Sequence, residues 1–296
     1  MPELPEVENV VRNLTSHLVG QQILDFQCLE KGIKLLGNTS PAEFKIGLNK
    51  QTIQKIQRIG KYIIINLSPR NNNLIVHLRM TGRFLYYPNI SKQEIIIPKY
   101  LIADNFTESP DLYSRIILKL TEGTLYFSDK RRFATFHLVS TPLTYPGISK
   151  LGPDALSSTF NLKYFKTKLK KSQRSIYSIL LDQTVVAGLG NIYVCEALAF
   201  SNIYPGIHAN ELTSTQIKIL HQEITKVLLA AIGDGGTTFS DYKDPQGKSG
   251  NFQTQLIAYG KKETILHGIK YQVNKLKIAG RNAYYIPSLQ KPFKST

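Results

Sequence analysis

The spacing of apolar residues divides the chain into an N-terminal helix, a region of short strands and a region of longer helices. Residues 3–18 place Val and Leu side chains at the spacing of one helix face. Residues 20–140 contain short apolar runs such as 62–67, 74–78 and 116–120, which turn residues separate. This part of the chain is therefore predicted to form a β-sandwich or barrel that one helix introduces.

The pattern changes at residues 141–157, a stretch rich in Pro and Gly that we interpret as a linker. Apolar residues then recur at helical spacing in four segments. These segments are residues 159–170, 175–184, 191–202 and 213–232. The last stretch alternates again, which predicts a β-hairpin that turns near Asn274 and Lys275.

These patterns together predict an α+β fold with two domains. The sequence shows no internal repeat and no long low-complexity tract. We expect a β-sandwich domain with its leading helix at residues 1–140 and a helical domain at residues 158–256. The hairpin and its tail follow at residues 257–296.

The charge of the chain favours a polyanionic partner. Lys and Arg number 37 against 21 Asp and Glu, so the formal net charge is +16. Nucleic acid is the first candidate for that partner, and a basic protein without such a partner is the alternative. The excess is densest in the last 36 residues, which hold eight basic residues and one acidic residue.

Other features of the composition exclude several classes of protein. The two cysteines, Cys28 and Cys195, cannot form a disulfide framework or a four-cysteine metal site. No run approaches the roughly 18 apolar residues of a membrane span, and the acidic N-terminus does not resemble a signal peptide. We therefore expect a cytoplasmic protein without a membrane partner.

The chain begins with Met1 followed by Pro2, a small residue after which the initiator Met is commonly removed. Removal would leave a secondary amine at the N-terminus. An α-amino group has a pKa of about 7.7–8.0 against about 10.4 for Lys, so much more of it is a free amine at neutral pH. A free amine is what nucleophilic attack requires. The alternative is that Pro2 simply begins a helix.

The N-terminal segment and seven later motifs resemble one family of enzymes. Residues 2–8, Pro-Glu-Leu-Pro-Glu-Val-Glu, closely resemble the N-terminal signature of the formamidopyrimidine-DNA glycosylase and endonuclease VIII family. Further similarities follow in the family's order along nearly the whole chain. They lie at residues 60–62, 77–82, 129–133, 151–156, 182–196, 235–253 and 259–261.

The resemblance implies roles for residues of this chain. An enzyme that attacks C1′ of a nucleotide must extrude that nucleotide from the duplex and refill the gap. The implied catalytic residues are the nucleophile Pro2, its acid–base partner Glu3, the phosphate-binding Lys61 and the finger residue Arg281. The implied DNA-binding residues are His77, Met80, Arg131, Phe133, Asn191 and Tyr259. The implied base-capping loop contains Gly236, Thr237, Thr238 and Tyr242.

Several of these residues also have an ordinary structural interpretation. Met80 and Phe133 can be core residues. Arg131 can be a solvated residue of a turn, and His77 can be a satisfied histidine between apolar neighbours. Asn191 follows a glycine turn, so it can be a plain helix N-cap or a phosphate ligand at a helix N-terminus.

The common bacterial members of the family end in a zinc finger with four Cys ligands, which this chain lacks. Aligning the finger through Arg281 places four apolar residues at the Cys positions. These residues are Leu266, Ile269, Ile286 and Leu289. Zinc requires Cys, His or carboxylate ligands. We therefore expect no zinc and no other cofactor, and a hairpin held by a small apolar cluster. A degenerate finger that no longer binds DNA is the alternative.

Other departures from the family pattern bear on substrate preference. Ala134 stands where the family's loop usually has Gly, Tyr177 where many members carry Lys, and Ser240 where Arg is frequent. The role of Glu6 is open, because it can be a secondary polar group of the site or an acid that stabilises the start of a helix.

The resemblance implies a bifunctional enzyme of base-excision repair. We expect a monomer that binds damaged double-stranded DNA and excises oxidised purines, namely 8-oxoguanine and formamidopyrimidines, through a Schiff base on Pro2. Strand cleavage by β,δ-elimination would follow. The alternatives are an endonuclease VIII-like preference for oxidised pyrimidines and a non-catalytic binder of damaged DNA. A role in DNA repair places the protein at the nucleoid.

Overall fold

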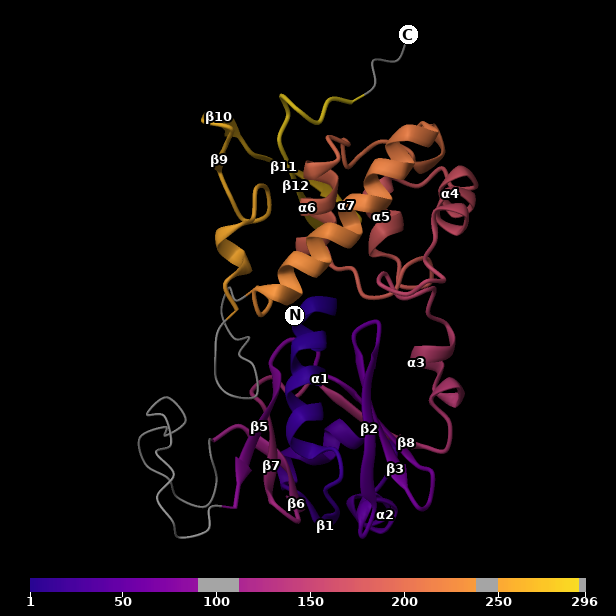
Figure 1. Ribbon diagram of the computed structural model, residues 1–296, viewed down its shortest axis with the longest axis vertical. Coiled ribbons are helices and arrows are strands. Elements are labelled where there is room, and N and C mark those ends of the chain that lie inside the picture. The colour runs from indigo at the N-terminus through magenta and orange to yellow at the C-terminus, as the bar shows by residue number, and fades with distance from the viewer. Residues whose placement is uncertain (90–111, 238–249, 293–296) are drawn as a thin grey trace. The chain divides into compact units, whose positions relative to one another are not determined.

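The computed structural model describes residues 1–89, 112–237 and 250–292 of the chain (Figure 1). The N-terminal part is rich in strands and the C-terminal part is mainly helical, as the apolar pattern predicts. Within these residues, no helix combines the length and the apolar character that crossing a membrane requires.

The chain forms two compact units. The first comprises residues 1–149 together with 235–251, and the second comprises residues 150–234 together with 252–296. Residues 235–251 thus return to the first unit, whereas the predicted boundaries placed them in the helical domain at 158–256. A main-chain hydrogen bond to a buried carboxylate of the first unit, described below, holds the beginning of this segment there.

The N-terminal helix α1 (Leu4–Leu18) forms as the apolar spacing predicts. Glu3 is its N-cap and shares a capping box with Glu6, while Pro5 lies in the first turn, where a missing N–H costs little. One face of the helix is buried. Its side chains are Leu4, Val7, Val10, Val11, Leu14 and Leu18.

Two antiparallel sheets of four strands each form the sandwich that the sequence predicts. The first sheet has the order β2 (Thr52–Ile59), β3 (Tyr62–Ser68), β4 (Asn73–His77), β8 (Thr135–Val139). The second has the order β1 (Ile23–Cys28), β6 (Ser114–Leu120), β7 (Gly123–Asp129), β5 (Gly82–Pro88). Short helices complete the unit. They are η1 (Glu30–Leu36), α2 (Pro41–Leu48), η3 (Pro142–Thr144) and α3 (Pro146–Ser149).

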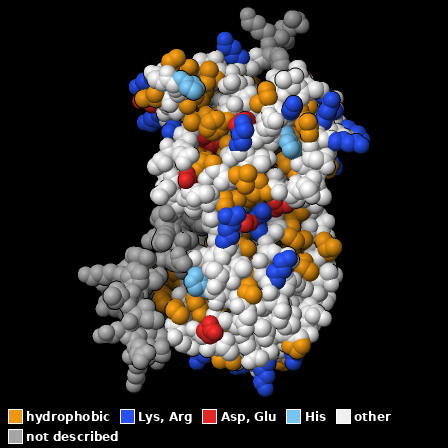
Figure 2. Space-filling model, viewed as in Figure 1, with side chains coloured by type: hydrophobic (Ala, Val, Ile, Leu, Met, Phe, Trp, Pro, Cys, Tyr) orange, Lys and Arg blue, Asp and Glu red, His pale blue; other side chains and the backbone are white. Residues whose placement is uncertain are grey.

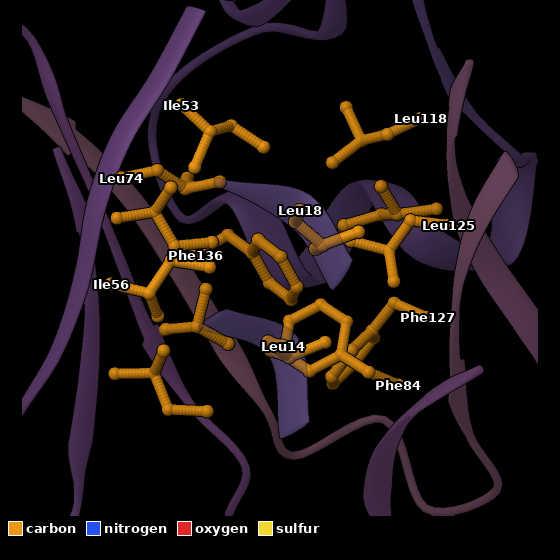
Figure 3. Close-up of a cluster of buried hydrophobic side chains, with 14 of the residues drawn as sticks. Leu14, Leu18, Ile53, Ile56, Leu74, Phe84, Leu118, Leu125, Phe127 and Phe136 are labelled. Atoms are coloured by element: carbon orange, nitrogen blue, oxygen red, sulfur yellow. The ribbon is translucent and has the colours of Figure 1, made fainter. Parts of the chain in front are cut away.

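The core of the first unit lies between the two sheets, and α1 contributes to it (Figure 3). Leu14 and Leu18 point from α1 into this cluster. Phe84, Phe127 and Phe136 pack edge to face, with the ring centres of Phe127 and Phe136 4.7 Å apart. Each buried side chain of this kind contributes roughly 1.5–3 kcal/mol. The core therefore gives the loops at the sheet ends a firm base.

The helical part of the second unit contains α4 (Leu162–Lys170), α5 (Ile176–Leu181), α6 (Asn191–Phe200) and α7 (Ser214–Gly233). The short helices η4 (Ala209–Glu211) and η5 (Phe252–Thr254) lie before and after α7. Helix α7 packs against both α4 and α6. Its buried face is formed by Ile217, Leu220, Ile224, Val227, Leu228, Ala231 and Ile232. These helices coincide with the four segments of helical spacing.

The terminal segment forms two hairpins, so the prediction of a single hairpin turning near Asn274 and Lys275 is wrong. The first hairpin pairs β9 (Glu263–Leu266) with β10 (Ile269–Gln272), and the second pairs β11 (Asn274–Ile278) with β12 (Arg281–Tyr285). Asn274 and Lys275 lie in β11. The turns fall at residues 267–268 and 279–280, where both residues of each pair have positive φ, as in the type I′ turns of two-residue hairpins.

Candidate active site

The N-terminal turn holds the two residues predicted to be the nucleophile and its partner. Pro2 and Glu3 are both buried, at the beginning of α1. The Glu3 main-chain N–H donates to Glu6 Oε2 at 2.8 Å, and the Thr237 N–H donates to Glu6 Oε1 at 2.8 Å. Glu6 therefore combines both interpretations left open by the sequence. It caps the helix, and it binds the predicted base-capping segment to the N-terminal turn.

Gly236 lies against the same carboxylate. Its φ is +87°, and a Cβ at this position would come within 3.0 Å of Glu6 Oε1. Only glycine combines this backbone conformation with so close an approach. Gly236 and Thr237 are buried in the first unit. The other two predicted capping residues, Thr238 and Tyr242, lie outside the described residues, as does Ser240.

A second contact links α1 to the turn that carries Lys61. The side chain of Arg58 in β2 donates from Nε to Glu8 Oε2 and from Nη1 to the Gly60 carbonyl, both at 2.9 Å. Lys61 follows directly, in the turn between β2 and β3, and is only 6% exposed. Arg58 therefore fixes the position of the Lys61 turn relative to the helix that begins at Glu3. The sequence analysis did not identify this arginine.

His77 lies at the end of β4, opposite Tyr62 of β3. The Arg79 main-chain N–H donates to its Nδ1 at 3.0 Å, so the neutral ring carries its proton on Nε2. Burial lowers the pKa of His77 to about 3, and the charges of Arg79 and Lys61 act in the same direction. His77 is thus an oriented, uncharged hydrogen-bond donor, a form that suits contact with a phosphate oxygen.

Met80, Arg131 and Phe133 gather at one place on the first unit. Arg131 Nη1 lies 2.9 Å from Met80 Sδ, and its guanidinium carbon lies 4.8 Å from the centre of the Phe133 ring. Met80 is 41% exposed and Phe133 46%, so neither belongs to the core. Two apolar side chains and one cation that project from a rigid sandwich can enter a stack of bases.

A pocket of about 480 Å³ adjoins these side chains. Its lining includes Met1 as well as Met80 and Phe133, so the N-terminus opens onto the same space as these two residues, which we call wedge residues together with Arg131. The complete lining is Met1, Lys34, Arg79, Met80, Arg132, Phe133, Ala134 and Thr135. Removal of Met1 would therefore expose the nitrogen of Pro2 beside this pocket.

The loop that carries Arg131 and Phe133 is organised by Asp129, which the sequence analysis did not single out. Asp129 is fully buried and accepts hydrogen bonds from the main-chain N–H groups of Arg131, at 3.1 Å, and Ala134, at 2.9 Å. The left-handed residue of the loop is Arg132, with φ 56°. Ala134 is therefore accommodated with its side chain buried, despite the glycine usual in the family pattern.

In the second unit, Asn191 stands at the first position of α6 and Gly190 is the N-cap, so the interpretation of Asn191 as a plain N-cap is wrong. The Asn191 side chain makes hydrogen bonds to two residues distant in the chain. Its Oδ1 accepts from the Tyr177 hydroxyl at 2.5 Å, and its Nδ2 donates to the Asn282 carbonyl at 3.2 Å. Asn282 follows Arg281 in β12, so this contact brings Asn191 next to the predicted finger arginine.

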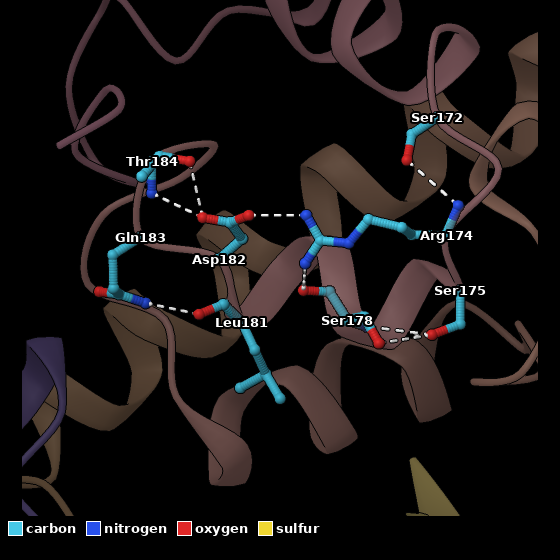
Figure 4. Close-up of polar contacts among 8 residues, drawn as sticks. All are labelled: Ser172, Arg174, Ser175, Ser178, Leu181, Asp182, Gln183 and Thr184. Carbon is cyan, nitrogen blue, oxygen red and sulfur yellow. Dashed lines mark hydrogen bonds and ion pairs between the residues drawn. The ribbon is translucent and has the colours of Figure 1, made fainter. Parts of the chain in front are cut away.

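The turn that leads to Asn191 is shaped by side chains that bind the main chain (Figure 4). Asp182 accepts from Arg174 Nη1 at 2.7 Å and from the main-chain N–H of Thr184 at 3.0 Å. Gln183 Nε2 donates to the carbonyls of Leu181 and Leu189, at 3.1 and 2.8 Å. These contacts fix the helix–turn–helix geometry around α5 and α6.

Tyr259 is positioned by a buried carboxylate at the beginning of the terminal segment. Glu196 of α6 is fully buried and accepts three main-chain hydrogen bonds, from Ile257 at 2.7 Å, Ala258 at 3.0 Å and Tyr259 at 2.7 Å. Burial raises the pKa of Glu196, and the three amides oppose this shift. The Tyr259 ring packs 5.0 Å from Tyr284 of β12.

The four positions of the expected apolar cluster differ in burial, and the prediction is wrong for Ile269. Leu266 and Ile269 face each other across the first hairpin, where Ile269 is 57% exposed. Ile286 is fully buried, and Leu289 is half-buried. Two short strands have too little surface to cover a core of their own. Across the described ranges, no three His, Cys, Asp or Glu side chains are close enough to hold a metal ion.

A buried glutamine, and not the expected apolar cluster alone, holds the end of the terminal segment in place. Gln290 is fully buried, its Oε1 accepts from the Ile286 N–H at 2.7 Å, and its Nε2 donates to the Ile203 carbonyl at 2.7 Å. Ile203 follows α6 in the chain. The terminal segment is thus held to the helical part by Glu196 at its beginning, by the contact between Asn191 and Asn282 in the second hairpin, and by Gln290 near its end.

Basic side chains are scattered over the face of the molecule that Figure 2 shows, in keeping with the net charge of +16. One exposed group lies on and just after α4. It consists of Lys163, Lys166, Lys168, Lys170 and Lys171. This group gives the second unit a positive surface that suits a polyanion.

Known proteins similar to this chain share one family. The description "Formamidopyrimidine-DNA glycosylase N-terminal domain" matches residues 1–136, and "Formamidopyrimidine-DNA glycosylase H2TH domain" matches residues 151–243. The formamidopyrimidine-DNA glycosylase of Desulforamulus reducens is 37% identical over 294 residues, which cover 98% of this chain and 99% of the relative. That of Lactococcus lactis subsp. lactis is 36% identical over 293 residues, with 98% and 100% covered.

Solved structures of such a relative in complex with DNA match this chain as well. The complex between the Lactococcus lactis Fpg and DNA that contains an abasic site has a TM-score of 0.82 at 33% identity, and 98% of this chain and 100% of that chain are covered. The complex of a mutant of the same protein with DNA that contains Fapy-dG has a TM-score of 0.83 at 33% identity, with the same coverage.

Proposed function

The chain belongs to the formamidopyrimidine-DNA glycosylase family, and we propose that it excises oxidised purines from duplex DNA and then cleaves the strand as an AP lyase. It is a DNA glycosylase of base-excision repair. The observation that carries the finer proposal is the N-terminal turn. Pro2 and Glu3 are buried at the beginning of α1, and Met1 opens onto the pocket that Met80 and Phe133 line.

In the proposed reaction, the nitrogen of Pro2, freed by removal of Met1, attacks C1′ of the extruded nucleotide. The bond from C1′ to the damaged base breaks, the base leaves with the electron pair, and it takes up the proton that the Pro2 nitrogen loses. The nitrogen lone pair then forms an iminium with C1′ as the bond to the ring oxygen breaks, and Glu3 supplies the proton that this oxygen needs. Glu3 is suited to this role because it follows Pro2 directly in the chain and the capping box with Glu6 fixes its position.

The iminium makes the hydrogens on the adjacent sugar carbon acidic. Loss of one of them eliminates the 3′ phosphate, and a second elimination releases the 5′ phosphate. Water then hydrolyses the iminium and regenerates the amine of Pro2. Lys61 and the neutral His77 would contact the DNA phosphates during these steps. Asn191 and Arg281 would contact them from the second unit.

Before any of these steps, the nucleotide must leave the duplex, which costs a few kcal/mol. The exposed group of Met80, Arg131 and Phe133 is suited to fill the resulting gap. Arg131 has guanidinium donors for the orphan base, and the thioether of Met80 adapts to an irregular space.

Oxidised purines are the proposed substrates, and paired duplexes test this choice. One duplex carries 8-oxoguanine opposite cytosine, one carries thymine glycol opposite adenine, and one is undamaged. The proposal predicts faster excision of 8-oxoguanine, and it predicts the loss of this excision in Glu3→Gln. Faster excision of thymine glycol would instead support an enzyme for oxidised pyrimidines. Binding of the damaged duplexes without excision would support a non-catalytic binder.

A further inference from the structure

A buried carboxylate joins the two loops that carry the wedge residues. Asp129 is the last residue of β7, and its Oδ1 accepts hydrogen bonds from the Thr81 hydroxyl and from the Arg131 N–H, the latter at 3.1 Å. Its Oδ2 accepts from the Ala134 N–H at 2.9 Å. One side chain therefore binds both ends of the turn that contains Arg131 and Phe133. It also binds Thr81, the residue that follows Met80.

The hydroxyl of Thr81 closes this arrangement into a ring. While it donates to Asp129, its Oγ1 also accepts from the Arg131 N–H at 3.1 Å. The residue after it, Gly82, pairs with Asp129 in the ladder between β5 and β7. The buried guanidinium of Arg115 donates from Nε to the Asp129 carbonyl at 3.2 Å. Main chain and side chain of Asp129 are thus both fixed.

Asp129 and the wedge residues that its ring of hydrogen bonds supports differ strongly in burial. Asp129 is fully buried, whereas Met80 and Phe133 are 41% and 46% exposed. Exposed loops are usually mobile, but hydrogen bonds to an ionised group are shorter and about twice as strong as neutral ones. The ring of hydrogen bonds therefore holds in place the main chain from which these exposed side chains project.

We propose that Asp129 and Thr81 are positioning residues for base extrusion. They hold the two loops at one spacing, so that Met80, Arg131 and Phe133 enter the duplex together. The inference rests on the proposed function, in which these three side chains fill the gap. A wedge that is already ordered loses less conformational freedom on insertion than two independent loops.

The test removes the hydrogen bond between Thr81 and Asp129 but keeps the carboxylate of Asp129. Thr81→Val deletes the hydroxyl in a side chain of the same shape, and Thr81→Ser restores it. Thr124→Val, at the opposite end of β7, is the matched control. Two DNA substrates separate extrusion from chemistry. One is a duplex with 8-oxoguanine opposite cytosine and 2-aminopurine beside the lesion, and the other is a single strand with an abasic site, which needs no unstacking.

We expect Thr81→Val to lower the single-turnover cleavage rate on the duplex about tenfold, roughly the effect of one lost hydrogen bond to a charged group. The rise of 2-aminopurine fluorescence should slow equally, and cleavage of the single strand should not change. Thr81→Ser should return the duplex rate to within about twofold.

Two results would overturn the inference. One is an equal loss of rate on both substrates, because a wedge has no part in single-strand cleavage. The other is a duplex rate for Thr81→Val equal to that for Thr124→Val. If the unmodified protein cleaves neither substrate, the proposed function fails and this inference fails with it. Asp129→Asn places an amide N–H₂ against main-chain donors, so we expect a larger loss on the duplex, with folding checked by thermal unfolding.

Discussion

The wedge loops of the first unit and the terminal hairpins of the second unit are both held by buried polar side chains. The two regions differ in how much apolar core lies beneath them. Asp129 fixes loops that already rest on a sandwich core shared by two sheets and α1. Glu196 and Gln290 fix hairpins of four or five residues per strand. The loops therefore depend on polar contacts for their shape, whereas the hairpins depend on them for their attachment.

This difference predicts that polar substitutions should change stability most in the terminal segment. Glu196→Ala removes the acceptor of three main-chain N–H groups, and buried donors without acceptors are costly. We expect a loss of about 3–5 kcal/mol in the free energy of unfolding of the second unit. Proteolysis and thermal unfolding would measure it. The exposed Glu211→Ala should stay within about 0.5 kcal/mol of the unmodified protein, and an equal effect of both changes would contradict the comparison.

Gln290→Leu should have the next largest effect. It keeps the side chain's size but removes the hydrogen bonds to Ile286 and Ile203, so we expect a loss of about 2–3 kcal/mol. Limited proteolysis within residues 257–292 would detect the release of the hairpins. The exposed Gln255→Leu is the control for replacing an amide by an apolar group.

The same comparison makes a prediction about metal. If polar contacts hold the hairpins in place of zinc, EDTA should leave the melting temperature and the DNA affinity of the unmodified protein unchanged. A drop in either value that added zinc reverses would contradict this prediction and would point to a metal site.

For the first unit, a further prediction concerns how its stability depends on pH, to which the buried His77 contributes. Because its folded pKa is lowered to about 3, the unfolded chain binds a proton below about pH 6.5 that the folded chain does not. The stability contribution is therefore complete above pH 6.5 and falls by up to about 1.4 kcal/mol per pH unit as the pH drops toward 3. His77→Gln should flatten this slope in urea titrations at several pH values. An unchanged slope in His77→Gln would contradict this account.

Among the substitutions, the smallest effect is expected at Tyr177, which is fully buried and binds Asn191 Oδ1. Tyr177→Phe should leave Asn191 less well oriented and weaken binding of abasic DNA about threefold to tenfold, or about 1 kcal/mol. Fluorescence anisotropy would measure the affinity. Tyr271→Phe on β10 is the matched control, and a threefold loss in that variant as well would argue against a specific role for Tyr177.

Local patterns in the sequence predicted the helices and the sandwich because these elements depend on residues close together in the chain. The apolar face of α1 and the four helical segments of the second unit follow directly from periodicity. The hairpin turns did not follow, because alternation continues through Asn274 and the turn at Ala279 begins with a residue that has no turn preference.

The buried polar contacts could not be predicted from local patterns. Thr81 and Asp129 are 48 residues apart, and Gln290 and Ile203 are 87 residues apart. A carboxylate or an amide in a sequence gives no sign that the fold will bury it against distant main-chain groups. The predicted site residues Pro2, Glu3, Met80 and Arg131 came from motif resemblance, whereas the residues that position them emerged only from the fold.

Trapping of the covalent intermediate tests the central claim most directly. Protein whose N-terminus is shown by mass spectrometry to be Pro2 is incubated with borohydride and a duplex that contains 8-oxoguanine opposite cytosine. A Schiff base on the N-terminal amine predicts a stable protein–DNA adduct whose attachment maps to Pro2, and it predicts none for protein that retains Met1. Failure of the Pro2 form to give an adduct, or attachment at a lysine instead, would contradict the assignment of Pro2 as the nucleophile.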